Sequence, residues 1–94
     1  MLEIIVRCYV KDGSNAEFIR LANLLAEKAR QDQGCISYYV GQDINNPNTI
    51  ALIEQWESYS HLQAHLQTGH FVELSAQCVA LQEKDSDYQT YNIV

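Results

Sequence analysis

The chain has 94 residues, which is enough for one small domain, because two independent cores would each be too small to fold unaided. Six basic residues against twelve acidic ones give a formal charge of -6, so the surface should repel nucleic acids and anionic lipids. Hydrophobic residues make up 47%, yet no apolar run approaches the roughly 20 residues that span a bilayer. We therefore expect one domain over residues 1–94 that binds neither nucleic acid nor membrane.

Two further features of composition bear on the compartment. The first residues lack the basic start and apolar segment of a secretory signal, with Glu3 in place of a lysine or arginine, which predicts a cytoplasmic protein. The three cysteines are odd in number, widely spaced and without a C-x-x-C motif, which argues against disulfides and zinc knuckles. Cys8, Cys35 and Cys78 are therefore predicted to be reduced core residues.

In the first third of the chain a strand precedes a helix. Apolar residues alternate with period two over residues 2–10, and they recur at three- and four-residue spacing over residues 15–31. Ser14 followed by Glu17 is typical of a capping box at the helix start. Gly34 is the expected glycine exit.

The middle of the chain predicts a hairpin. Residues 35–40 are rich in aromatic and branched side chains, which favour a strand. The Asn45-Asn46-Pro47-Asn48 segment indicates a turn, because asparagine tolerates positive φ and proline fixes its own φ. A third strand over about 49–57 follows.

The last third returns to helical spacing and ends in a strand. After Ser58 a short helix is expected, with a capping box that begins at Ser60. Thr68 interrupts this helix and is the expected N-cap of a second helical segment, which runs to about residue 82. Residues 84–87 are predicted to form a polar loop. Alternation over residues 88–94 predicts a terminal strand.

This order of elements predicts an α+β fold, the ferredoxin-like βαββαβ arrangement of an antiparallel sheet with its helices on one face. The opposite face should be solvated, yet Ile5, Tyr9, Ala51 and Ile53 make it apolar as well. A second apolar face needs a partner, and an identical subunit is the simplest one. We therefore predict a homodimer with sheet packed on sheet.

All three histidines lie within ten residues. His61 and His65 have the i, i+4 spacing that can hold a metal, but no third ligand is indicated by spacing, so no metal site is predicted. His70 falls in the first turn after a helix break, where the helix dipole keeps an imidazole neutral and able to act as a base. The alternatives are a hydrogen-bonded structural role for His70 and a semi-buried one for His65.

A second group of candidates surrounds the end of the third strand. Trp56 is expected in the core, and Glu54 on the same face needs Arg7 or a tyrosine as partner, or a cavity to line. Arg7 is interpreted either as an ion-paired surface residue or as a ligand contact. One of Tyr38 and Tyr39 should face the helices. No cofactor or nucleophile motif is present, which leaves acid–base chemistry or binding in an apolar pocket.

Five short motifs are spread over the whole chain. They are Lys11-Asp12-Gly13, Gly34-Cys35-Ile36-Ser37-Tyr38, Asn46-Pro47-Asn48, Glu54-x-Trp56-Glu57 and Ala64-His65 with His70-Phe71. On these motifs the chain resembles the antibiotic biosynthesis monooxygenase family of small dimeric α+β barrel proteins, which includes quinol monooxygenases.

The resemblance implies a pocket between helices and sheet and a dimer through the other sheet face. It also implies oxidation without flavin, haem or metal: a base removes a proton from a phenol or hydroquinone, and the resulting anion reduces O2. Its implied ligand is a small aromatic or quinone-like molecule. On this analogy His65 or His70 is assigned as the base, and Trp56 and Tyr38 as an aromatic wall that binds substrate. Arg7, Glu54 and Phe71 complete the candidate substrate-binding residues.

Two alternative functions remain open. An isomerase of the same superfamily would use the same histidines to move a proton on a hydroxyketone, although few basic residues are available to anchor a phosphorylated sugar. A non-catalytic dimeric protein would hold a metabolite in the same pocket. The usual proline before the second histidine is replaced by Gly69.

Overall fold

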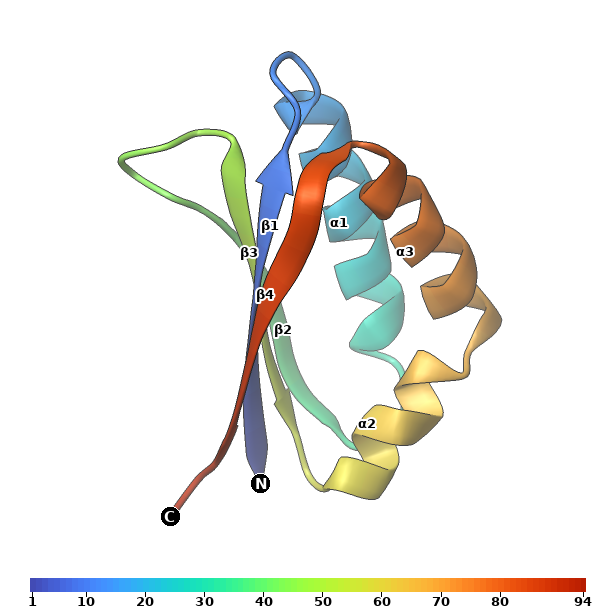
Figure 1. The fold of residues 1–94 in the computed structure, drawn as a ribbon. Coiled ribbons are helices and arrows are strands. Elements are labelled where there is room, and N and C mark those ends of the chain that lie inside the picture. Colours follow the sequence, from blue (N-terminus) through green and yellow to red (C-terminus); the bar gives the residue numbers. More distant parts are fainter.

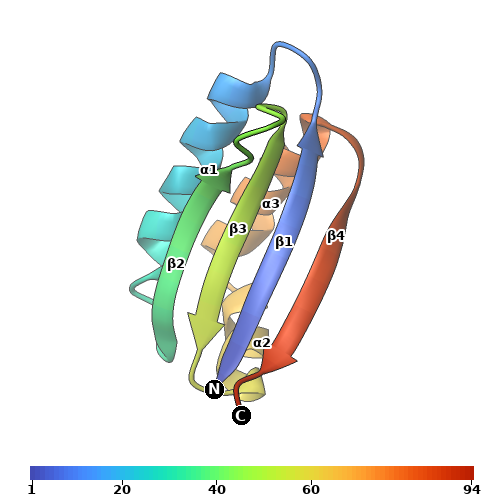
Figure 2. The same ribbon diagram turned by 90° about the vertical axis from the view of Figure 1, so that its left-hand side faces the viewer.

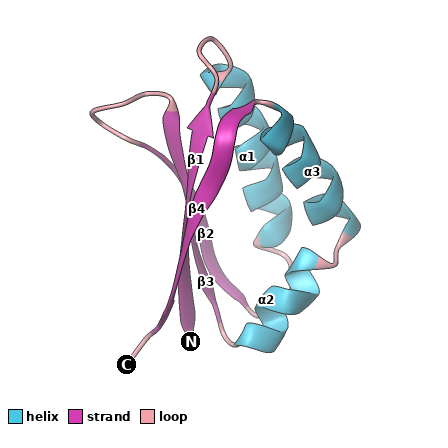
Figure 3. Ribbon diagram, viewed as in Figure 1, coloured by secondary structure: helices cyan, strands magenta, loops and turns pink.

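A computed structural model describes residues 1–94, which form a four-stranded antiparallel sheet with three helices on one side (Figure 1). The sheet order is β2-β3-β1-β4, seen face on in Figure 2. Figure 3 shows all the helices on the same side of the strands, so the predicted ferredoxin-like α+β fold is confirmed. The elements are β1 (Leu2–Val10), α1 (Asn15–Ala29), β2 (Cys35–Gln42), β3 (Thr49–Trp56), α2 (Tyr59–Leu66), α3 (Gly69–Ala80) and β4 (Gln82–Asn92).

The core lies between the helices and the inner face of the sheet. Strand β1 sits between β3 and β4, and its even-numbered residues from Ile4 to Val10 are buried, as the alternation predicts. Helix α1 presents its own buried stripe to this face, and that stripe includes Phe18, Leu21 and Leu25. Cys8 and Cys78 are buried, Cys35 is half-buried, and all three are free thiols.

The prediction of a polar loop over residues 84–87 is wrong. These residues belong to β4, which runs from Gln82 to Asn92 and pairs antiparallel with β1. An edge strand needs only backbone hydrogen bonds on one side, so its side chains can be polar without loss of pairing. Two register shifts, between Arg7 and Val10 of β1, accompany the polar segment.

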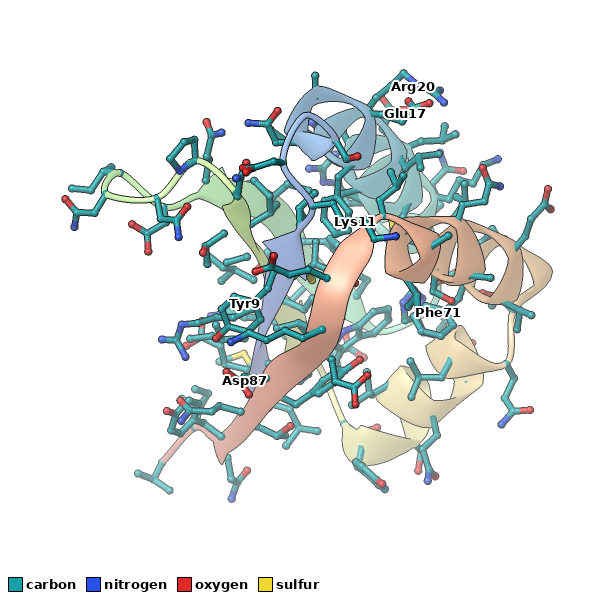
Figure 4. All side chains as sticks on the ribbon, turned by 45° about the horizontal axis from the view of Figure 1, so that its top comes forward. Tyr9, Lys11, Glu17, Arg20, Phe71 and Asp87 are labelled. Carbon is teal, nitrogen blue, oxygen red and sulfur yellow. The ribbon has the colours of Figure 1, made fainter.

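Of the three predicted helix caps, only the cap of α3 is confirmed. Ser14 makes no side-chain capping bond, and Glu17 pairs with Arg20 on the exposed side of α1 instead (Figure 4). Helix α2 is capped by Ser58, whose hydroxyl accepts from the backbone N–H of His61, and not by Ser60. The predicted cap of α3 by Thr68 is confirmed.

Gly34, in the loop after α1, lies in close contact with α2. Its φ is +85°, a conformation that favours glycine, and a Cβ at this position would lie 2.2 Å from Cγ of His61. The backbone of the loop therefore packs directly against α2. Helix α1 ends at Ala29, two residues before the predicted boundary.

The outer face of the sheet is not covered by any helix (Figure 2). It carries exposed apolar and aromatic side chains, among them Tyr39, Ile53 and Tyr91. Tyr9 and Asp87 lie side by side on it from neighbouring strands and are hydrogen bonded (Figure 4). None of the helices is long and apolar enough to cross a membrane.

Candidate functional site

A cavity of about 280 Å³ lies between the helices and the sheet, close to the lower end of the ~300–1,000 Å³ typical of small-molecule sites. Fifteen of its twenty lining residues are hydrophobic. Every helix and strand contributes at least one lining residue. The polar or aromatic lining residues are Phe18, Tyr38, Glu54, Tyr59, Phe71, Ser75, Gln82, Ser86, Tyr88 and Thr90.

The cavity opens between α2, α3 and β4. Five of its lining residues are themselves exposed to solvent, namely Tyr59 and Leu66 of α2, Val79 of α3 and Tyr88 and Thr90 of β4. Figure 1 shows the first half of β4 beside α3, and α2 lower down on the same side of the sheet. A ligand would therefore enter past a mostly aromatic and aliphatic rim that carries no charge.

Glu54 is the one charged residue that lines the cavity. It lies on the inner face of β3 and its exposure is only 6%. Burial raises the pKa of this carboxyl to about 7, and hydrogen bonding offsets only part of that rise. Near neutral pH it can therefore both take up and release a proton, as a general base requires.

Two aromatic residues flank Glu54. The indole N–H of Trp56 donates to Glu54 Oε1 at 3.0 Å, and Trp56 is fully buried. Tyr38 faces Glu54 across the β2–β3 ladder, and its buried hydroxyl makes no hydrogen bond although it lies near enough to influence the pKa of Glu54. Burial, and then the carboxylate, raise the pKa of Tyr38, so its hydroxyl stays protonated and free to donate.

The thiols of the cavity are neutral. Burial raises the pKa of Cys8, and it raises the pKa of Cys78 to about 11. Ser86 Oγ donates to Cys8 Sγ at 3.5 Å. Neither cysteine therefore competes with Glu54 as a base.

A second polar cluster joins Asp32 to two histidines. Asp32 lies in the loop after α1, and its Oδ2 is 2.7 Å from Nδ1 of His65 in α2 and 2.8 Å from Nε2 of His70 in α3. Burial would raise the pKa of Asp32, but the two hydrogen bonds outweigh it and lower that pKa. The carboxylate therefore remains charged and holds the junction between α2 and α3 against the loop.

His65 does not line the cavity but packs against Phe71, which does, and against Trp56. It is 1% exposed, and its ring centroid lies 4.6 Å from that of Trp56 and 5.2 Å from that of Phe71. Burial lowers the pKa of His65, which keeps the imidazole neutral at neutral pH. Its Nε2 is buried without a hydrogen-bond partner.

The structure brings together some of the predicted site residues. Tyr38, Glu54 and Phe71 line the cavity, and Phe71 lies at the start of α3 (Figure 4). Trp56 touches both Glu54 and His65 without lining the cavity, and neither His65 nor His70 lines it.

The structure does not place Arg7 at the cavity. Arg7 is exposed on the outer face, where it forms no ion pair, and it lies on the far side of the sheet from the cavity. His61 and His65 share helix α2 at i, i+4 spacing, but Nδ1 of His61 lies 2.7 Å from the Ser58 hydroxyl instead of facing His65. Asp32 was not predicted at all, since it lies 33 residues from His65 and no local pattern links them.

Two curated proteins are similar to this chain in sequence. The uncharacterized protein sll1783 of Synechocystis is 32% identical over 89% of this chain, which spans only 57% of that relative's length. A 24-residue segment, 26% of this chain and 23% of the relative, is 67% identical to the Escherichia coli protein named "Probable quinol monooxygenase YgiN".

The fold and the family agree. The crystal structure of an antibiotic biosynthesis monooxygenase superposes with a TM-score of 0.94 and 29% identity, over 100% of this chain and 99% of that one. Residues 1–77 match the antibiotic biosynthesis monooxygenase family. The chain therefore belongs to the antibiotic biosynthesis monooxygenase family.

Proposed function

We propose that this protein is a cofactor-independent monooxygenase that oxidises a small aromatic or quinol-type molecule with O2. The observation that carries the proposal is the single carboxylate, Glu54, buried in an otherwise uncharged cavity, with a pKa of about 7. Membership of the family and the name of the Escherichia coli relative support the reaction class.

Glu54 is the base in this proposal, in place of the His65 or His70 expected from the resemblance. Its carboxylate removes the proton of a phenolic hydroxyl, and the Tyr38 hydroxyl donates to the oxygen that becomes negative. The indole N–H of Trp56 occupies one carboxylate oxygen and so positions the other. The aromatic anion then reduces O2 in a cavity that is mostly apolar.

The overall reaction balances without an external reductant. A quinol supplies two electrons and two hydrogens, one atom of O2 enters the ring to give a hydroxyquinone, and the other leaves as water. The proton held by Glu54 departs with that water, which restores the carboxylate.

The absence of a basic residue from the cavity lining separates this proposal from the isomerase alternative. A phosphorylated sugar would need cationic anchors, and the lining offers none. A non-catalytic protein would bind its ligand in the same cavity, so only the presence or absence of turnover distinguishes it from the proposed monooxygenase.

The test is oxygen uptake by the purified chain with one- and two-ring hydroquinones, corrected for spontaneous oxidation. With ¹⁸O2 the product should carry one labelled oxygen and the water the other. Saturable ligand binding without enzyme-dependent uptake would establish the non-catalytic alternative. Isomerisation of a small hydroxyketone in a parallel assay, without oxygen uptake from any hydroquinone, would establish the isomerase.

We also propose that the outer sheet face packs against a second copy. Tyr39 and Tyr91 expose 61% and 47% of their surface there, and Ile53 exposes 36%. Burial of this patch would be favourable by ~25 cal/mol per Å², and an isologous contact needs only one surface. Sedimentation should give a dimer for the wild type and a folded monomer for Ile53→Asp; a wild-type monomer at micromolar concentration would refute the packing.

A further inference from the structure

Asp32, His65 and His70 form a cluster with no place in the proposed oxygenation, because none of the three lines the cavity. Each comes from a different element, namely the loop after α1, helix α2 and helix α3. The three donor atoms all lie within 4.8 Å of one another. Sites of this composition, two imidazoles and one carboxylate, are a ligand set for first-row divalent cations.

The two imidazoles converge on one point. Nδ1 of His65 and Nε2 of His70 both lie within 2.8 Å of the same atom, Oδ2 of Asp32. Metal–ligand bonds of about 2.0–2.2 Å place neighbouring ligand atoms about 3–3.5 Å apart, so small movements of these side chains would admit a cation. Oδ1 of Asp32 makes no hydrogen bond and is free to complete the carboxylate's coordination.

The protonation of the histidines is compatible with a cation. A bound imidazole must present a lone pair, so both rings would change tautomer. The proton on Nδ1 of His65 would move to Nε2, a nitrogen that makes no hydrogen bond in the structure, and the proton on Nε2 of His70 would move to Nδ1 of that ring. These tautomer changes break no side-chain hydrogen bond other than the two to Asp32. Metal binding would therefore replace the two hydrogen bonds from the histidines to Asp32 with metal–ligand bonds.

Access and charge also suit a cation. The side chains of His70 and Asp32 are 25% and 16% exposed, so an ion can enter from solvent and keep water ligands. His65, at 1%, forms the floor. The formal charge of the chain, -6, favours cations over anions at its surface.

We propose that Asp32, His65 and His70 bind one divalent transition-metal ion at the junction of α2 and α3. This ion would bridge the three elements behind Phe71 and Trp56, which both pack on His65. The site is separate from the cavity, so its existence does not depend on the proposed oxygenase activity.

The test is titration of the metal-free, untagged full chain with Co²⁺, followed by displacement with Zn²⁺. One Co²⁺ per chain should bind and give visible d–d absorption without a thiolate charge-transfer band. His70→Gln should weaken binding by more than the roughly 10- to 100-fold typical of losing an outer-shell partner. His61→Gln is the matched control, since His61 lies on α2 but bonds to Ser58, and should bind like the wild type.

A second variant keeps the test decisive if His70→Gln fails to fold. Asp32→Asn retains the shape of the side chain, and circular dichroism establishes whether it is folded before titration. Zn²⁺ should raise the melting temperature of the wild type and of His61→Gln, but not that of Asp32→Asn. No saturable binding up to millimolar metal, a thiolate band, or equal losses in His61→Gln and His70→Gln would each overturn the site.

Discussion

Glu54 bonds to Trp56 and Asp32 bonds to His65, the two rings that pack against each other, and the fold shifts the pKa values of these two carboxyls in opposite directions. Glu54 touches one indole N–H and an apolar cavity, so burial dominates and raises its pKa to about 7. Asp32 accepts hydrogen bonds from two histidines, which outweigh its partial burial and lower its pKa. Burial without cationic partners makes a carboxylate a proton acceptor near pH 7, whereas paired donors make it a permanent anion.

The largest expected effect is on turnover. Glu54→Gln removes the proposed base and should lower kcat by about 10²- to 10⁴-fold, the usual contribution of general base catalysis. In the wild type, kcat/KM should rise with pH and level off above about pH 7, where the carboxylate is ionised. Oxygen uptake as a function of pH checks both expectations.

Glu57→Gln is the matched control for this prediction. Glu57 is an exposed glutamate three residues further along the chain, and its loss should leave turnover unchanged. If His65→Ala abolishes activity in a folded protein while Glu54→Gln does not, the base is the histidine and the comparison fails.

The next effect is on stability as a function of pH. The pKa of Glu54 is higher in the folded protein than its ordinary value of 4.5, so its contribution to stability is fully present below about pH 4.5 and is lost as pH rises through about 7. Glu54→Gln does not incur this loss. Relative to the wild type it should gain about 3 kcal/mol in free energy of unfolding between pH 4.5 and 8.

Chemical denaturation of both proteins at each pH measures this difference. The lowered pKa of His65 acts in the opposite direction over part of the range, so only the difference between the two proteins isolates Glu54. A difference that does not change with pH would show that the carboxyl is not protonated in the folded state.

Asp32→Asn should move stability the other way. At pH 7 without metal it loses two charge-assisted hydrogen bonds, and the free energy of unfolding should fall by ~1–3 kcal/mol. Urea denaturation in the presence of a chelator checks the value. A variant more stable than the wild type would contradict the stabilising role of the pairing.

Tyr38→Phe should have the smallest effect on stability, within ~0.5 kcal/mol, because the hydroxyl has no hydrogen-bond partner to lose. Turnover should nevertheless fall, by up to about 10²-fold, because this hydroxyl is the proposed donor to the substrate anion. Steady-state kinetics beside thermal denaturation separates the two. Unchanged kinetics would exclude Tyr38 from the reaction.

Local rules of the chain were enough for most of the fold. Alternation in residues 2–10 identified the buried face of β1, and Thr68 marked the start of α3. The polar strand at residues 84–87 was missed because an edge strand is held by backbone pairing to β1, which leaves no hydrophobic period to detect.

The candidate site was harder to predict, for a related reason. Glu54 stood out in the sequence as a carboxylate on an apolar strand face, and its partner Trp56 lies two residues away. Asp32 gave no signal, because it meets His65 and His70 only when the loop after α1 packs against α2, at the close approach that Gly34 permits.

The sequence by itself determined the size, the acidic charge, the order of the elements and the two apolar faces of the sheet, because these follow from residue type and short-range periodicity. Only the tertiary structure decided which carboxylate faces the cavity and which faces the histidines. The reason is physical: pKa values and ligand sets depend on burial and on partners tens of residues away, and the pattern of neighbouring residues does not record either.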